Sequence, residues 1–166
     1  MKLAMLLSLL LLASTDSIAQ TLQIERIDVV EYGLYTNTTT GQETASGTAA
    51  GTISYLTDIQ HAATTRTVPA QQGVEFGYRY IVVGAPLGAD VQLRFVTIFP
   101  TPGLQNPATQ QLMTQEEHNF VDTIGETEYD GYGLDYDWEV VPGIWTLQIW
   151  YQGRKLAEQQ FTVERQ

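Results

Sequence analysis

The chain contains no cysteine, so its fold must be stable without disulfides. Exported domains of eukaryotes often depend on such bridges, and their absence favours a bacterial periplasm over a eukaryotic secretory route. A lipid anchor of the usual bacterial kind, which needs a cysteine after the leader, is excluded for the same reason.

Basic residues are also scarce. Lys and Arg number 8 against 19 Asp and Glu, which gives a formal net charge of -11 at neutral pH. No Lys or Arg occurs between Arg94 and Arg154. Nucleic acids and anionic membrane surfaces are bound through basic patches, so this composition argues against both as partners. Acidity this strong more often serves solubility than the binding of a specific partner.

Residues that commonly perform catalysis are few. After residue 19 the only serines are Ser46 and Ser54, and the only histidines are His61 and His118. They show no spacing typical of a metal site or a catalytic triad, and no glycine-rich phosphate loop is present. Residues 116–139, which we call the acidic segment, are rich in Asp and Glu. Carboxylate pairs for glycoside hydrolysis can be drawn from this segment, but almost any pair there would serve. We therefore expect no enzymatic activity.

Residues 1–19 have the pattern of a secretory signal peptide. Lys2 precedes an apolar run over residues 3–13, and Ser17-Ile18-Ala19 forms a small-x-small cleavage site. The apolar run is shorter than the roughly 20 residues that a membrane span needs, and no other segment is a candidate. We expect a periplasmic or secreted protein with one domain over residues 20–166.

Beyond residue 19, the chain alternates between apolar and polar residues with a period of two, which is typical of half-buried strands. Trp145, Leu147, Ile149 and Tyr151 form one face of such a strand, and a turn at residues 152–155 returns the chain into a second strand over residues 156–163. This is the clearest hairpin in the sequence.

Further strands are expected over residues 22–35, with a bulge near Arg26, and over 52–59, 64–68, 73–83, 91–99 and 120–124. Residues 37–51, rich in Thr, Gly, Ala and Ser, are predicted to be a mobile loop, and residues 126–133 a second loop. About eight or nine short strands with frequent turns predict an all-β fold. Uneven loops favour an antiparallel β-sandwich over an up-and-down barrel.

The segment Gly143-Ile144-Trp145-Thr146-Leu147 resembles the penultimate strand of immunoglobulin-like domains. Trp145 stands where those domains have a corner tyrosine, and Leu147 where they have a cysteine. The resemblance implies that the indole N–H of Trp145 takes over the corner hydrogen bond.

Three pieces spread over the chain are similar to a family of exported bacterial domains known only as a domain of unknown function. They are residues 31–35 (Glu-Tyr-Gly-Leu-Tyr), residues 68–70 with 73–77 (Val-Pro-Ala and Gly-Val-Glu-Phe-Gly), and residues 142–145 (Pro-Gly-Ile-Trp) with 161–163. This resemblance implies an immunoglobulin-like β-sandwich and export, and it implies no activity.

The acidic segment offers a candidate metal site. Its carboxylates repel one another, and a divalent cation would relieve that repulsion. Glu126, Glu128 and Asp130 alternate with other residues and are followed by Gly131, which is the spacing of a calcium loop. The segment departs from the calcium-loop pattern at several other positions. The candidate Ca²⁺ ligands are Glu126, Glu128, Asp130, Asp135 and Asp137. The alternative is a solvated acidic loop that keeps the protein soluble.

Aromatic residues accompany these acids and suggest a binding surface. Rings beside carboxylates suit a glycan, because they stack on its C–H faces, and they equally suit the polar surface of a protein. The candidate ligand-binding residues are Tyr129, Tyr132, Trp138 and Trp150. For Trp138 and Trp150, core packing is favoured over exposure, and for the two tyrosines burial and exposure are equally expected.

The sequence as a whole predicts a non-catalytic, exported immunoglobulin-like module that binds a protein or an envelope component. Loops at one end, including residues 126–133, would make the contact. A small carbohydrate-binding module is the alternative function. The sequence identifies neither the ligand nor the oligomeric state.

Overall fold

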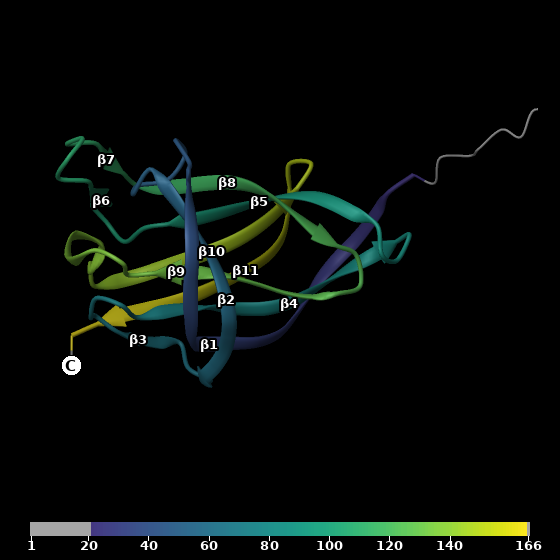
Figure 1. Cartoon of the computed structure of the whole chain (residues 1–166), viewed down its shortest axis with the longest axis horizontal. Helices are drawn as coiled ribbons and strands as arrows, with labels where there is room; N and C mark the ends of the chain where they lie inside the picture. The colour runs from purple at the N-terminus through teal and green to yellow at the C-terminus, as the bar shows by residue number, and fades with distance from the viewer. Residues whose placement is uncertain (1–20, 166) are drawn as a thin grey trace, which may run out of the picture.

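Two β-sheets enclose an aromatic core in the computed structural model, which describes residues 21–165 (Figure 1). The predicted signal peptide, residues 1–19, lies outside the described residues. The strands are β1 (Gln23–Thr44), β2 (Thr52–Ala63), β3 (Thr67–Pro69), β4 (Glu75–Ala85), β5 (Asp90–Ile98), β6 (Leu104–Gln105), β7 (Leu112–Met113), β8 (Gln115–Thr123), β9 (Thr127–Gly133), β10 (Gly143–Tyr151) and β11 (Arg154–Glu164). A single 3-10 turn, η1 (Asp137–Glu139), precedes β10.

One sheet has four strands in the order β2-β1-β4-β9, and the other has five in the order β3-β11-β10-β5-β8. Strands β6 and β7 form a separate pair. Every pairing is antiparallel except that of β3 with β11. The predicted antiparallel β-sandwich is therefore confirmed. Its two main sheets hold nine strands, and the short pair β6-β7 adds to the predicted set.

The core forms between strands β4 and β10, where the alternation in the sequence is most regular. On β4, the period of two places Phe76, Tyr78, Tyr80 and Val82 on one face, and all four are fully buried. On β10, Trp145, Leu147 and Ile149 are buried in the same way, as predicted. The centroids of the Phe76 and Trp145 rings lie 5.9 Å apart with an edge-to-face angle of 84°. This geometry is the favoured one for aromatic pairs.

Trp145 also makes the predicted corner hydrogen bond. Its indole Nε1–H donates to the carbonyl oxygen of Val141 at 3.0 Å. The bond ties the segment that follows η1 to the start of β10, in the manner of the corner tyrosine of immunoglobulin-like domains. A fully buried indole needs such a partner, because an unpaired N–H in the core is costly.

The prediction of loops over residues 37–51 and 126–133 is wrong for most of both segments. Residues 37–44 continue β1, and a turn over residues 45–51 joins them to β2. The Thr-rich composition suits a strand, since threonine is β-branched, and the hairpin pairing supplies its hydrogen bonds. Residues 127–133 are likewise not a loop but the edge strand β9, paired with β4 from Ile81↔Thr127 to Glu75↔Gly133.

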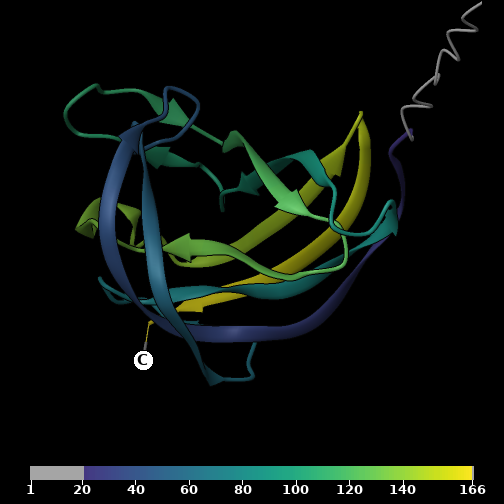
Figure 2. The same cartoon turned by 45° about the vertical axis from the view of Figure 1, so that its right-hand side comes forward.

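Strand β1 changes partners along its length. Residues 23–35 pair with β4, and residues 34–44 pair with β2, so the hairpin extends beyond the sheet. The register shift between Ile24 and Arg26 confirms the predicted bulge. Gly33 sits at the change of partner with φ 143°, and a side chain there would overlap the carbonyl oxygen of Ala63. We call residues 36–60 the hairpin arm. Figure 2 shows the arm in blue, rising from the four-stranded sheet toward β6 and β7.

Among residues 21–165, no helix has the length and apolar character of a membrane-crossing segment.

Candidate functional site

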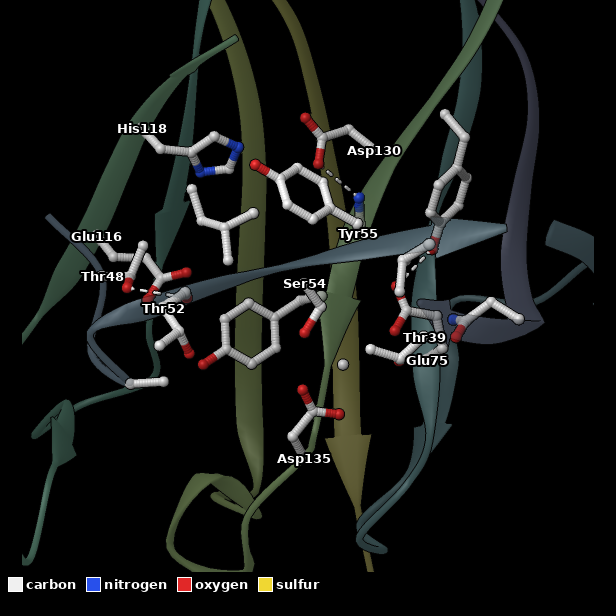
Figure 3. A pocket seen from close by; sticks show the side chains of 18 of the residues that line it. Thr39, Thr48, Thr52, Ser54, Tyr55, Glu75, Glu116, His118, Asp130 and Asp135 are labelled. Atoms are coloured by element: carbon white, nitrogen blue, oxygen red, sulfur yellow. Dashed lines mark hydrogen bonds between the residues drawn. The ribbon is translucent and has the colours of Figure 1, made fainter. Parts of the chain in front are cut away.

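A pocket of about 330 Å³ lies under the hairpin arm, between the sheet edges formed by β8 and β9. Three parts of the chain supply its carboxylates: Glu75 begins β4, Glu116 lies on β8, and the segment from β9 to η1 carries Asp130, Asp135 and Glu139. Figure 3 shows Glu75, Glu116, Asp130 and Asp135 around this space, with β2 running across it. A volume of this size is at the lower end of small-ligand sites.

The tip of the arm is docked on β8 and on the segment after β6. The amide N–H of Ala49 donates to Glu116 Oε2 at 2.8 Å, and that of Glu117 donates to the carbonyl of Gly47 at 3.1 Å. The side-chain amide of Asn106 donates to the carbonyl of Ala49 at 2.8 Å. These bonds connect the arm to the opposite sheet and close one end of the pocket.

We expect Asn106→Ala to loosen the arm tip, because the carbonyl of Ala49 loses its donor. Hydrogen exchange of the amides over residues 45–51 should become several-fold faster, since one such bond contributes about 1 kcal/mol. Exchange measured by mass spectrometry tests this. Asn119→Ala on β8 is the matched control, because the exposed Asn119 side chain makes no hydrogen bond within the described part of the chain. Equal exchange in the two variants would contradict the docking role.

The carboxylates of the pocket are held by tyrosines and backbone amides. The hydroxyl of Tyr129 donates to Glu75 Oε1 at 2.7 Å. The hydroxyl of Tyr132 donates to Glu139 Oε1 at 3.1 Å, and the amide of Tyr136 donates to Glu139 Oε2 at 2.9 Å. Hydrogen bonds of this kind fix the orientation of each carboxylate without neutralising its charge.

Burial changes the acid–base behaviour of these groups. It raises the pKa of Glu75, of Glu116 and of Glu139 to about 7 in each case, and that of Asp122 nearby to about 6. Burial also raises the pKa of Asp130 well above its ordinary value. Neighbouring carboxylates add to the shift, since Asp135 raises the pKa of Glu75, and Glu139 that of Glu116. Carboxyls with such pKa values concentrate at functional sites.

Two of the four aromatic residues predicted to bind a ligand line the pocket, namely Tyr129 and Tyr132. Tyr132 is buried and contacts the ring of Trp145, with centroids 4.8 Å apart. Trp138 is partly buried against the core and stacks on Tyr136. Trp150 lies beside the guanidinium of Arg94 and does not line the pocket. The four residues therefore do not form one surface.

The predicted calcium ligands are also separated. Asp130 and Asp135 line the pocket, whereas Glu126, Glu128 and Asp137 do not. Within residues 21–165, no three His, Asp or Glu side chains are placed to hold a metal ion. The reason is that residues 127–133 form an extended strand, in which residues two apart are nearly 7 Å apart. A calcium loop instead curls its ligands around one point.

The sequence interpretation missed Glu75 and Glu116 as pocket residues. Glu75 belongs to the face of its strand opposite to Phe76 and Tyr78, and the sequence interpretation assigned no role to it. The arm turns that position into part of a pocket, and a residue pattern local to β4 carries no sign of the arm. Glu116 begins the acidic segment, but its position there does not show that it faces a pocket until the docking of Ala49 is known.

Comparison with known proteins agrees with the fold. The sandwich, the corner bond of Trp145 and the sheet order define an immunoglobulin-like domain. The family described as "Domain of unknown function (DUF3859)" matches residues 23–163, and the chain belongs to this family. A crystal structure of an immunoglobulin-like protein from Pseudomonas aeruginosa at 1.50 Å resolution is similar, with a TM-score of 0.57 and 25% sequence identity. The match covers 89% of this chain and 100% of that chain. A comparison with curated proteins found no match.

Proposed function

We propose that this chain is a non-catalytic, exported immunoglobulin-like module that binds a protein or an envelope component through the pocket under the hairpin arm. The observation that carries this proposal is the pocket itself, where oriented carboxylates and tyrosines surround a space that the arm partly covers. A folding domain has no need to gather so many acids in a partly buried space, because their burial destabilises it. Export is inferred from the leader pattern of residues 1–19.

The environment of the histidine in the pocket supports a binding role over catalysis. His118 packs between Phe95 and Phe120, with ring centroids 5.6 Å and 6.0 Å away. Burial lowers the pKa of His118 and so favours the neutral ring, which packs well against other aromatic rings. The hydroxyl of Ser54 accepts a hydrogen bond from Gln42 at 3.1 Å, and no serine–histidine hydrogen bond occurs in the described residues. A nucleophile with an adjacent general base is the arrangement that hydrolases of this kind need.

The carbohydrate-binding alternative depends on exposed rings, and it is supported by Tyr136. This residue is 41% exposed and stacks on Trp138 with an interplanar angle of 13°. Trp150 is less suited to sugar stacking, because the Arg94 guanidinium lies 5.6 Å from its ring centroid. Glycan-array binding that disappears in Trp138→Ala but persists when the pocket is filled would favour this second function.

The pocket proposal is tested by filling the pocket with a side chain. Ser54 lines the pocket from β2. The indole of Ser54→Trp should occupy much of the pocket volume, and tryptophan is well tolerated in strands. The assay is a melting-temperature screen against envelope components: peptidoglycan fragments, amino acids, amines and glycans. A ligand that binds only the folded state raises the melting temperature of the wild type by several degrees at saturation.

Thr57→Trp provides the matched control, because Thr57 is an exposed position on the same strand outside the pocket. We expect the ligand-induced shift to persist in Thr57→Trp and to be lost in Ser54→Trp. Shifts of equal size in both variants would place the binding site elsewhere and overturn the proposal.

A further inference from the structure

We propose that the pocket takes an organic cation, that is, one or more protonated amines on an aliphatic chain. The source is a free diamine or polyamine, or a lysine side chain of a partner protein. This inference rests on the proposed function, because it assigns a ligand class to the same pocket.

The charge of the pocket is the first argument. Five carboxylates contribute to its lining, and no Lys or Arg does. None of these five carboxylates forms an ion pair with a basic side chain in residues 21–165. Outside the pocket some acids do have basic partners, as Glu117 has Arg94 and Glu158 has Lys155. The acids of the pocket thus have no basic side chain of the protein as a counter-charge.

The second argument is that the carboxylates of Glu75 and Asp135 converge on Gly133. A Cβ at Gly133 would lie 2.7 Å from Glu75 Oε2 and 3.1 Å from Asp135 Oδ1. Both oxygens therefore approach the same point from β4 and from the segment after β9. Their mutual repulsion is part of the raised pKa of Glu75. An ammonium group near that point would donate hydrogen bonds to both oxygens and remove the repulsion.

Asp130 provides an independent observation. Its side chain is partly buried and lines the pocket. Its Oδ1 accepts the amide of the next residue, Gly131, at 2.9 Å (Figure 3). Its Oδ2 has no hydrogen-bond or ion-pair partner among the described residues. This oxygen is therefore a free acceptor on a residue that lines the pocket, and it is available to a donor from a ligand.

The spacing of the acids favours an extended amine over a metal ion. No three acidic or histidine side chains of residues 21–165 could share one metal, so the negative charge is spread along the pocket. The lining also contains apolar residues of β2, namely Ile53, Leu56 and Ile59. Methylene groups of an alkyl amine would contact these side chains, and the tyrosine rings of the pocket would favour its charged end.

Proton release should accompany binding. The titratable groups that face the pocket are Tyr55 of β2, Glu75 of β4, Glu116 and His118 of β8, Tyr129, Asp130 and Tyr132 of β9, Asp135 after β9, and Glu139 of η1. Several of the carboxyls are partly protonated at neutral pH, because their pKa values lie near 7. A bound ammonium favours the ionised form, so each carboxyl that pairs with it loses its proton.

Isothermal titration calorimetry with hexamethylenediamine and hexanediol tests the ligand class. The two molecules share an aliphatic chain and differ in charge. We expect saturable binding of the diamine with one molecule per chain, no binding of the diol, and proton release at neutral pH seen as a dependence of the heat on the buffer. A peptide with a single lysine and its norleucine analogue form the second arm. Binding of the lysine peptide alone would assign the cation to a partner protein, and binding of the diamine alone to a free amine.

Two isosteric variants locate the cation. Asp130→Asn and Glu75→Gln should each weaken diamine binding about tenfold or more, the effect of losing one charged hydrogen bond. Glu117→Gln, which removes a carboxylate outside the pocket, should leave the affinity unchanged. The variant Ser54→Trp keeps the net charge of the protein, so any binding that survives in it is non-specific attraction to an acidic surface.

The results separate this inference from the proposed function. A neutral ligand whose melting-temperature shift is abolished by Ser54→Trp, together with no saturable binding of either amine, would overturn the cation and retain the pocket. Amine binding of equal strength in Ser54→Trp, or in Asp130→Asn and Glu75→Gln together, would also overturn it. No shift with any ligand and no amine binding would reject both proposals.

Discussion

Replacing Trp145 with alanine is expected to lower the free energy of unfolding by about 4 kcal/mol, in the range found for large aromatic residues truncated in cores. Trp145 has no exposed surface. Its ring contacts Phe76, Phe99 and Tyr132, with centroid distances of 5.9, 5.2 and 4.8 Å. The substitution leaves a cavity among three rigid rings, and such rings cannot collapse to fill it. Chemical denaturation monitored by circular dichroism measures the effect.

The size of this loss is large relative to the stability of a typical domain, which is about 5–15 kcal/mol. Trp145→Phe separates packing from hydrogen bonding, because it keeps an aromatic ring and removes the donor to Val141. It should cost about 1–3 kcal/mol. Trp150→Ala is the matched control on the same strand, since Trp150 is only partly buried on the opposite face. A loss in Trp150→Ala equal to that in Trp145→Ala would contradict the assignment of the core.

The difference between these two tryptophans was visible in the sequence. A period of two assigns Trp145 and Trp150 to opposite faces, and the burial of Leu147 and Ile149 agrees with that assignment. The same rule identified the inner face of β4. Strands with strongly contrasting faces are thus predictable, because only one register buries their apolar residues.

The two misassigned segments lack this contrast. Residues 37–44 contain no large apolar residue, so their strand forms through pairing with β2 and not through burial. In residues 127–133, charged, aromatic and glycine residues are mixed. The side chains of Glu128 and Asp130 point to the same face as the buried Tyr132, so the apolar pattern of a strand is hidden.

The pocket was beyond the reach of the sequence for a related reason. It exists because the arm docks on β8 through Ala49 and Glu116, which are 67 residues apart. Which aromatic residues face that space depends on the same docking. Tyr129, Tyr132 and Asp130, which the acidic and aromatic composition singled out, line this pocket, and the composition could not add Glu75 from β4.

The stability of the protein should fall as the pH rises from about 5 to about 7.5, by about 3 kcal/mol or more. The physical reason is the set of buried carboxyls in the pocket. Burial raises the pKa of Glu75, Glu116 and Glu139 to about 7, whereas unfolded glutamates titrate near 4.3. Between these values the folded protein binds more protons than the unfolded chain, so stability decreases with increasing pH in that window.

Two other groups, His118 and Glu158, limit how far stability increases as the pH is lowered. Burial lowers the pKa of His118, so stability falls as the pH drops below the ordinary value of histidine and part of the gain is offset. The pKa of Glu158 is lowered, first by its hydrogen bond from Lys155, and this contribution is lost only as the pH falls toward and below about 4. The maximum of stability should therefore lie near pH 5. Water in the pocket screens the carboxyls, which reduces the effect below the sum of the separate shifts.

Denaturation of the wild type and of Glu75→Gln over this pH range measures the contribution of the pocket. Glu75→Gln keeps the shape of the side chain and removes the buried charge, so it should raise stability at about pH 7.5 and flatten the profile. Glu126→Gln changes an exposed glutamate outside the pocket and should leave the profile as it is. A wild-type stability that increases steadily from pH 5 to 7.5 would show that the carboxyls are solvated. If Glu75→Gln stabilises the fold and also weakens diamine binding, the buried charge is retained for the ligand at the expense of stability.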